Sequence, residues 1–222
     1  MTTMNYEKQR HQMVQKQIKN RGVRDKLVLD AMNNVKRHLF VPEEEQNFAY
    51  KDRPLRIGLD QTISQPYIVA LMTELLHLKG DEKVLEVGTG SGYQAAILGG
   101  IVQEVHSVER HKELAERATG LIASLGYTNI FIHQGDGSLG WPQDAPYDAI
   151  LVTAAAPSLP TPLMEQLVEN GRLVIPVGHP GSQALEVWQK KADGFDKEWI
   201  AQVAFVPLLG KHGLEKDPRN RF

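Results

Sequence analysis

The chain has 222 residues, no cysteine and a formal net charge of −2 at pH 7. Without cysteine it can form neither a disulfide nor a thiolate zinc site, and its histidines lack H-E-x-x-H spacing, so we expect no metal. The charge and the absence of long Lys/Arg runs argue against extended nucleic acid as a partner. No apolar run reaches the roughly 18 residues of a membrane span, and the amino terminus lacks a signal-peptide core. We therefore expect a cytoplasmic protein with no membrane partner.

Residues 1–80 have a helical, charged pattern that differs from the rest of the chain. One helix is predicted over Tyr6–Asn20 and ends at Gly22, since glycine can take the left-handed position after a helix. A second begins at Asp25, a suitable N-cap, and a third follows Pro66. The second helix places four apolar residues on one face: Leu27, Val28, Ala31 and Met32. We expect a helical N-terminal extension that packs beside the remaining residues.

Residues 81–222 alternate between strand and helix patterns. The predicted order is strand Lys83–Val87, helix Ser91–Leu98, strand Glu104–Val108, helix His111–Leu125, strand Asn129–His133 and strand Asp148–Thr153. This alternation predicts a mainly parallel sheet with helices on both faces. Three later strand-like runs, Arg172–Val177, Ala184–Lys190 and Glu198–Val206, are joined by turns and predict an antiparallel edge. The length suits one α/β domain over 1–222.

A glycine-rich turn follows the first strand of this series. Gly88, Gly90 and Gly92 allow a sharp bend and close approach of a ligand just before a helix N-terminus, which is typical of a nucleotide-cofactor site. Tyr93 stands where a dinucleotide fingerprint needs its third glycine, so a nicotinamide cofactor is disfavoured. With Glu86 the turn reads E-x-G-x-G-x-G, which resembles motif I of class I S-adenosylmethionine methyltransferases.

Three acids near this turn are candidate cofactor ligands, each with a structural alternative. Glu109 lies 21 positions after Gly88, the spacing at which α/β nucleotide folds bind ribose hydroxyls, but an acid before a helix is also favoured by the helix dipole. The resemblance to methyltransferases implies that Asp136, followed by Gly137, contacts the adenine amino group, although Asp and Gly also form ordinary turns. Glu86 could instead accept N–H bonds from the glycine loop, a role compatible with cofactor binding.

Several blocks spread over most of the chain resemble protein-L-isoaspartate O-methyltransferases. They are Arg37–Pro42, Gln61–Pro66, Glu86–Gln94, Gly135–Gly137, Tyr147–Ile150, Thr153–Pro157, Gly171–Gly178 and Phe205–Leu208. The resemblance implies a Rossmann-like methyltransferase fold. It departs from the family at Leu59–Asp60 and Lys36, near the edge of the expected substrate loop, which puts the peptide preference in question.

The resemblance also implies the chemistry. A methyl group passes from S-adenosylmethionine to the α-carboxylate of an L-isoaspartyl residue in a damaged protein or peptide, and the ester starts repair to aspartyl. Since a carboxylate is already ionised at neutral pH, no general base is required. The enzyme supplies alignment, which is worth roughly 7 to 11 kcal/mol in well-ordered cases. We expect the enzyme to be a monomer.

Ser64 occupies the family's usual active-site position, where its hydroxyl can donate to the incoming carboxylate. The alternative is that Ser64 caps the helix that begins near Pro66, a stabilisation of about 1 kcal/mol. Thr62 and Ile63 are expected to shape the loop around the methyl donor.

Two other functions remain open from the sequence. A methyltransferase acting on RNA or a small metabolite would favour a basic cleft or an N-P-P-Y-like tetrapeptide after the fourth strand, where this chain has Thr153–Ala156. A cofactor-binding regulator without catalysis would usually show damage in the glycine turn or around Ser64, and both are intact.

Overall fold

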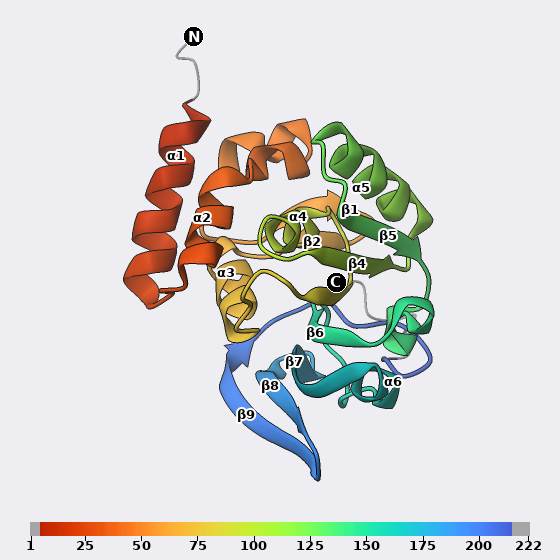
Figure 1. The fold of residues 1–222 in the computed structure, drawn as a ribbon. Helices are drawn as coiled ribbons and strands as arrows, with labels where there is room; N and C mark the ends of the chain where they lie inside the picture. The colour runs from red at the N-terminus through yellow and green to blue at the C-terminus, as the bar shows by residue number, and fades with distance from the viewer. Residues whose placement is uncertain (1–4, 215–222) are drawn as a thin grey trace.

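The computed structural model describes residues 5–214, which form a seven-stranded sheet with the order β5-β4-β3-β6-β7-β8-β9 (Figure 1). Its strands are β3 Lys83–Val87, β4 Glu104–Glu109, β5 Ile130–Gln134, β6 Tyr147–Val152, β7 Leu167–His179, β8 Ser182–Lys191 and β9 Gly194–Val203. The strands from β5 to β7 pair in parallel. The pairs β7–β8 and β8–β9 are antiparallel, so the predicted parallel sheet and its antiparallel edge are both confirmed.

The described residues contain the α-helices α1 Tyr6–Gln12, α2 Lys26–Asn34, α3 Pro66–Leu75, α4 Tyr93–Gly99, α5 Lys112–Ser124 and α6 Thr161–Glu165. The first five correspond to helices that the sequence predicted, with shifts at their ends. Shorter helical turns are η1 Met13–Ile18, η2 Lys19–Arg21, η3 Arg37–Phe40, η4 Glu43–Phe48, η5 Gly137–Leu139 and η6 Pro142–Asp144. The sequence pattern did not predict α6. Among the described residues, no helix is both long and apolar enough to cross a membrane.

Two apolar clusters cover the two faces of the sheet, because successive strand side chains point to opposite faces. On β3, Val84 belongs to the cluster beneath the N-terminal helices, α4 and α5, whereas Leu85 and Val87 belong to the other. The second cluster includes Leu163 of α6 and Tyr147 of β6. Both faces of the sheet are therefore covered, as a mainly parallel sheet requires.

Within the N-terminal extension, η1 and α2 pack against α3, and α2 also contacts α4 of the central domain (Figure 1). The predicted first helix is present but changes from α to π geometry over Met13–Ile18, and it ends at Gly22, whose φ of 110° is left-handed. The Asp25 side chain caps α2 by accepting a hydrogen bond from the Val28 N–H. Of the predicted apolar face of α2, Val28, Ala31 and Met32 are buried, but Leu27 is 40% exposed.

The extension also contains a β-hairpin, β1 Leu55–Gly58 and β2 Gln61–Ile63, which the helical interpretation missed. Its two turn residues, Leu59 and Asp60, have φ values of 53° and 57°, as in a type I′ turn. Such turns usually use Asn or Gly, so the sequence carried no hairpin signal. Arg117 of α5 donates a hydrogen bond to Ile57 O at 2.6 Å and ties the hairpin to the central domain.

Candidate functional site

The strand order places a crevice beside β3. From β3 the chain first builds β4 and β5 on one side, and then crosses to β6 on the other side. Open α/β sheets bind ligands outside the carboxyl ends of the strands at such a switch point. Gly88 directly follows β3 and Thr153 directly follows β6, so both lie at this edge.

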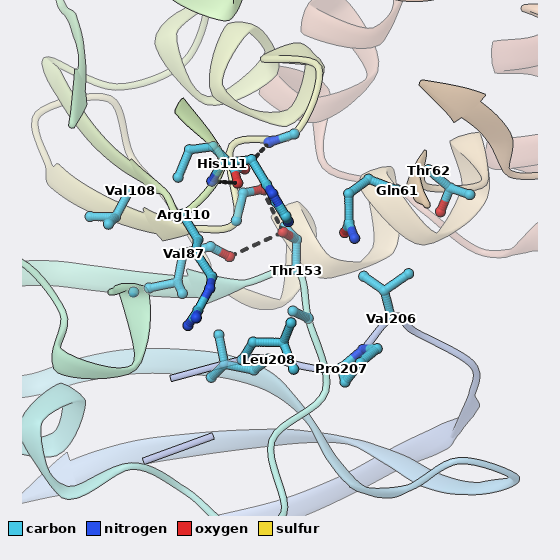
Figure 2. Close-up of a pocket in the computed structure, with 16 residues that line it drawn as sticks. Gln61, Thr62, Val87, Val108, Arg110, His111, Thr153, Val206, Pro207 and Leu208 are labelled. Carbon is cyan, nitrogen blue, oxygen red and sulfur yellow. Dashed lines mark hydrogen bonds between the residues drawn. The ribbon is translucent and has the colours of Figure 1, made fainter. Parts of the chain in front are cut away.

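Two cavities adjoin this edge and share the walls formed by Thr62, Gly88, Gly90 and Thr153. The first has about 590 Å³ of empty space and receives residues from the hairpin, the strand ends and the segment after β9 (Figure 2). The second has about 410 Å³ and lies against Ser64, Glu86 and Tyr93.

The glycine turn is shaped by backbone geometry that other residues would not tolerate. Gly88 has a φ of 99°, and a Cβ there would lie 2.4 Å from Thr153 Oγ1. Gly92 has a φ of 83°, caps α4 and packs against Ala118, where a Cβ would lie 3.3 Å away. Gly88 and Gly90 line both cavities, but Gly92 lines neither. The third glycine of the motif therefore serves packing between α4 and α5.

Glu86 is fully buried and has one oxygen without a partner among the described residues. Its Oε2 accepts a hydrogen bond from Ser107 Oγ at 2.5 Å, and Ser107 Oγ lies 2.6 Å from Thr89 Oγ1. Its Oε1 has no hydrogen-bond partner. Burial raises the pKa of Glu86 to about 8, the Ser107 bond opposes the rise, and the charge of Glu109 adds to it. Among the described residues no N–H of the glycine loop bonds Glu86, so the structural alternative for this residue is wrong.

Glu109, in contrast, does accept a hydrogen bond from the glycine loop. Its Oε2 accepts from the Gly90 N–H at 2.8 Å, and its Oε1 accepts from the His111 N–H at 2.8 Å. The residue lines the first cavity and is only 5% exposed. A carboxylate has about four lone-pair sites, so two remain for a ligand. Glu109 thus fixes the glycine turn and still presents oxygen acceptors to the cavity.

Asp136 and Gly137 follow β5, but only Gly137 lines the first cavity. Asp136 Oδ1 accepts from the backbone N–H and hydroxyl of Ser138, at 3.0 and 2.7 Å, and Oδ2 accepts from the Lys211 N–H at 2.8 Å. Burial opposes its ionisation, but these hydrogen bonds outweigh burial and lower the pKa of Asp136. This geometry supports the turn alternative for Asp136.

The loop from Thr62 to Gln65 carries Ser64 into the wall of the second cavity, beside Ile63. The residue at the N-cap of α3 is Gln65, and it makes no side-chain cap. Asp52 instead accepts hydrogen bonds from the Tyr67 N–H at 3.3 Å and from Gln65 Nε2 at 2.7 Å. The helix-cap alternative for Ser64 is therefore wrong.

Arg37 holds this loop from behind, a role the sequence did not reveal. The fully buried guanidinium donates hydrogen bonds to Ala49 O and Ser64 O, both at 2.8 Å. Its carbon lies 4.9 Å from the centroid of the Tyr93 ring. Desolvation lowers the pKa of Arg37 to about 10, which leaves it charged at neutral pH. A buried, bonded cation therefore fixes the backbone of Ser64.

Other lining residues were not predicted as cofactor ligands. Arg110 and His111 line the first cavity, and Gln61 lies there with Thr62. Thr153 lines both cavities, and its hydroxyl lies 2.7 Å from Gly88 O. For Arg110 and Thr153, a candidate signal was their position directly after β4 and β6, which end at this edge of the sheet.

The residues present fit S-adenosylmethionine. The open glycine turn and the free lone pairs of Glu109 suit a ribose, and the unpartnered Glu86 Oε1 suits a cationic donor. The glycine turn at these cavities lacks the spacing of a dinucleotide fingerprint, whose three glycines hold a pyrophosphate.

Comparison with known proteins agrees with this fit. A family model described as Protein-L-isoaspartate(D-aspartate) O-methyltransferase (PCMT) matches residues 8–213. A protein-L-isoaspartate O-methyltransferase of Syntrophobacter fumaroxidans is 51% identical over 212 residues, which cover 96% of this chain and 99% of that protein. A Roseiflexus relative with the same name is 57% identical over 86% of this chain and 88% of its own length.

Solved structures give the same answer. A protein-L-isoaspartate O-methyltransferase superposes with a TM-score of 0.85 at 28% identity, over 92% of this chain and 67% of its own. A Plasmodium falciparum protein described as a PCMT, in complex with S-adenosyl-L-homocysteine, gives a TM-score of 0.78 at 29% identity, over 90% of this chain and 98% of its own. By sequence and by fold, the chain belongs to the protein-L-isoaspartate(D-aspartate) O-methyltransferase family.

Proposed function

We propose that this chain transfers a methyl group from S-adenosylmethionine to the free α-carboxylate of L-isoaspartyl residues in proteins and peptides, which starts their repair to aspartyl. The observation that carries the proposal is the family match over residues 8–213, together with the Ser64 loop beside the glycine-turn cavities. The bound cofactor supplies an electrophilic methyl group on sulfur.

The cofactor-binding residues are proposed from their positions around the two cavities. Glu109 binds the ribose hydroxyls, and Gly88 and Gly90 allow close backbone approach. Glu86 accepts a hydrogen bond from the cofactor's amino group through Oε1. Thr62 and Ile63 form the opposite wall. Gly137 borders the first cavity, whereas Asp136 contributes through the turn that it stabilises.

Ser64 is proposed to orient the substrate carboxylate. Its neutral hydroxyl can donate one hydrogen bond to one oxygen and leave the other oxygen free to attack. Arg37 keeps the hydroxyl in position because it binds Ser64 O. Displacement of the attacking oxygen by about 1 Å costs about a hundredfold in rate, so a fixed loop is a rate requirement.

An isoaspartyl residue differs from aspartyl in the position of its free carboxylate by one methylene, which is enough to misalign the attack. The test is therefore transfer of labelled methyl to an L-isoaspartyl peptide and to the matching L-aspartyl peptide. We expect methylation of the first and essentially none of the second. Equal rates on both peptides, or activity only on RNA or a small metabolite, would contradict the proposal.

Further features of the proposed enzyme follow from composition and fold. We propose that the chain acts as one domain over 1–222, of which 1–4 and 215–222 lie outside the described residues, with a helical extension over 1–80 and the central domain over 81–222. We also propose that it is a cytoplasmic monomer without nucleic-acid or membrane partners. Sedimentation of the purified chain, with and without isoaspartyl peptide, tests the monomer.

A further inference from the structure

Two histidines and an aspartate meet on the sheet face opposite α4 and α5. His106 of β4 and Val108 point to the same face, and Val108 belongs to the cluster that contains α6. His106 Nδ1 lies 3.0 Å from His133 Nε2 and 3.4 Å from Asp144 Oδ2. One ligand atom from each of the three residues lies within 4.8 Å of the other two.

Each of the three side chains is held in place by a further contact. His106 Nε2 lies 2.6 Å from Glu104 Oε1, and His106 is 4% exposed. The His133 ring stacks on Trp141 with centroids 4.2 Å apart, and Trp141 Nε1 donates to Asp144 Oδ2 at 2.9 Å. Lys83 Nζ donates to Asp144 O at 2.6 Å and anchors its backbone.

The hydrogen bonds also set the protonation needed for a metal ligand. In a neutral His106, the proton on Nε2 bonds Glu104, so Nδ1 carries a lone pair toward His133 and Asp144. A histidine ligand whose other nitrogen donates to a carboxylate is the usual arrangement around protein-bound zinc.

The distances match a small tetrahedral ion. With zinc bonds of about 2.0–2.1 Å, two ligands of a tetrahedral site lie about 3.3 Å apart. The two measured separations, 3.0 and 3.4 Å, need shifts of only a few tenths of an ångström. Two imidazoles and a carboxylate favour zinc or a related transition metal over Mg²⁺, which prefers six oxygen ligands.

We propose that His106, His133 and Asp144 form a binding site for a divalent transition-metal ion, with Zn²⁺ as the first candidate, and that Glu104 orients His106 within it. The ion would tie β4 and β5 to the η6 turn, with water as a fourth ligand. None of the three ligands lines either cofactor cavity, so the site is separate from methyl transfer. The proposal does not depend on the proposed function.

Sequence spacing gave no sign of this site. The ligands lie 27 and 11 residues apart and come from two adjacent strands and a turn. The expectation of no metal rested on the absence of cysteine and of local histidine motifs. The same absence of cysteine helps the experiment, because no thiolate competes for the added ion.

The test is calorimetric titration of Zn²⁺ into chelator-treated, dialysed protein, repeated with Mg²⁺. Co²⁺ serves as a spectroscopic probe, since tetrahedral coordination gives strong visible absorption. We expect one Zn²⁺ per chain, no measurable Mg²⁺ binding, and a higher melting temperature with Zn²⁺.

Three variants locate the binding. Asp144→Asn keeps the size of the side chain and an acceptor for Trp141, and it should lower the affinity for Zn²⁺ at least about a hundredfold. Glu104→Gln should weaken it about 10- to 100-fold, the usual effect of removing an orienting partner. His179→Gln, at an exposed position, is the matched control and should change nothing. Absence of stoichiometric binding, or equal affinity in Asp144→Asn and the parent chain, would overturn the site; circular dichroism checks that each variant folds.

Discussion

Binding of S-adenosylhomocysteine should weaken as the pH falls below 8, because Glu86 must lose a proton before it can pair with the ligand's ammonium group. Glu86 is fully buried, its Oε1 has no partner, and burial raises its pKa to about 8. In the free protein at neutral pH this carboxyl is therefore mostly protonated. Glu86→Gln removes the titration and preserves the shape of the side chain.

The size of the effect follows from the ionised fraction. With a pKa of about 8, Glu86 is about half ionised at pH 8 and about 1% ionised at pH 6. If the ligand binds the ionised form, its apparent affinity is reduced by that fraction, or about 50-fold between pH 8 and pH 6. The Glu86→Gln variant should bind weakly at both pH values and show no such slope.

The same shift makes a second, opposite prediction for stability. In the folded protein the pKa of Glu86 lies above its usual value of 4.5. Protonated Glu86 therefore contributes its full stability to the folded protein below pH 4.5, and this contribution is lost as the pH rises through about 8. Because glutamine does not ionise, the ligand-free Glu86→Gln variant should not lose stability in this way. At pH 8 its free energy of unfolding should exceed that of the parent chain by a few kcal/mol, as an order of magnitude.

Calorimetry measures the binding prediction directly. Titrations from pH 6 to 9 give the slope, and at pH 7 two buffers with different ionisation enthalpies count the proton released. His111 lines the first cavity beside Glu109, so His111→Gln is the control. Affinity that stays flat with pH, or a slope that survives in Glu86→Gln, would refute the reasoning.

Three other substitutions test separate parts of the site. Ser64→Ala should lower turnover on isoaspartyl peptide about a hundredfold, because the hydroxyl is proposed to orient the substrate. Its melting temperature and its affinity for S-adenosylhomocysteine should not change, because Ser64 caps no helix. A loss of stability with full turnover would instead favour a helix-cap role for Ser64. Glu109→Ala should lower the free energy of unfolding by roughly 2–4 kcal/mol in denaturant melts and also weaken cofactor binding, because two part-buried N–H groups lose their charged acceptor. The control Glu113→Ala, at an exposed position, should do neither. Arg37→Lys should reduce stability by about 2 kcal/mol and lower kcat more than cofactor affinity, because lysine cannot bind both carbonyls; an unchanged kcat would show that Arg37 does not position the loop.

Local patterns predicted the central domain because its elements are set by neighbours in sequence. The strand ending at Val87, the glycine turn and the following helix are encoded within about a dozen residues, and β3 has the predicted bounds. The stop at Gly22 and the cap at Asp25 are local in the same way. The hairpin was missed because its turn uses Leu59 and Asp60 with left-handed φ values, which those residue types seldom adopt.

Long-range pairings inside the site could not be predicted. Glu86 accepts a hydrogen bond from Ser107, which lies 21 residues away on the neighbouring strand. Glu109 accepts a hydrogen bond from the glycine turn. The α3 cap comes from Asp52, and the loop support comes from Arg37, 27 residues before Ser64. Each pairing depends on strand register or on docking of the extension, which no local pattern specifies.

On the proposed function, the distribution of charge around the second cavity suits a carboxylate nucleophile. Among the described residues that line it, none is Lys, Arg or His, and the donors beside Ser64 are neutral. A cation in that wall would pair with the substrate carboxylate and reduce its nucleophilicity. The nearby cation, Arg37, is buried and donates to the Ala49 and Ser64 carbonyls. It therefore fixes the backbone of the Ser64 loop, and on the proposed function it leaves the substrate carboxylate its charge for the methyl group.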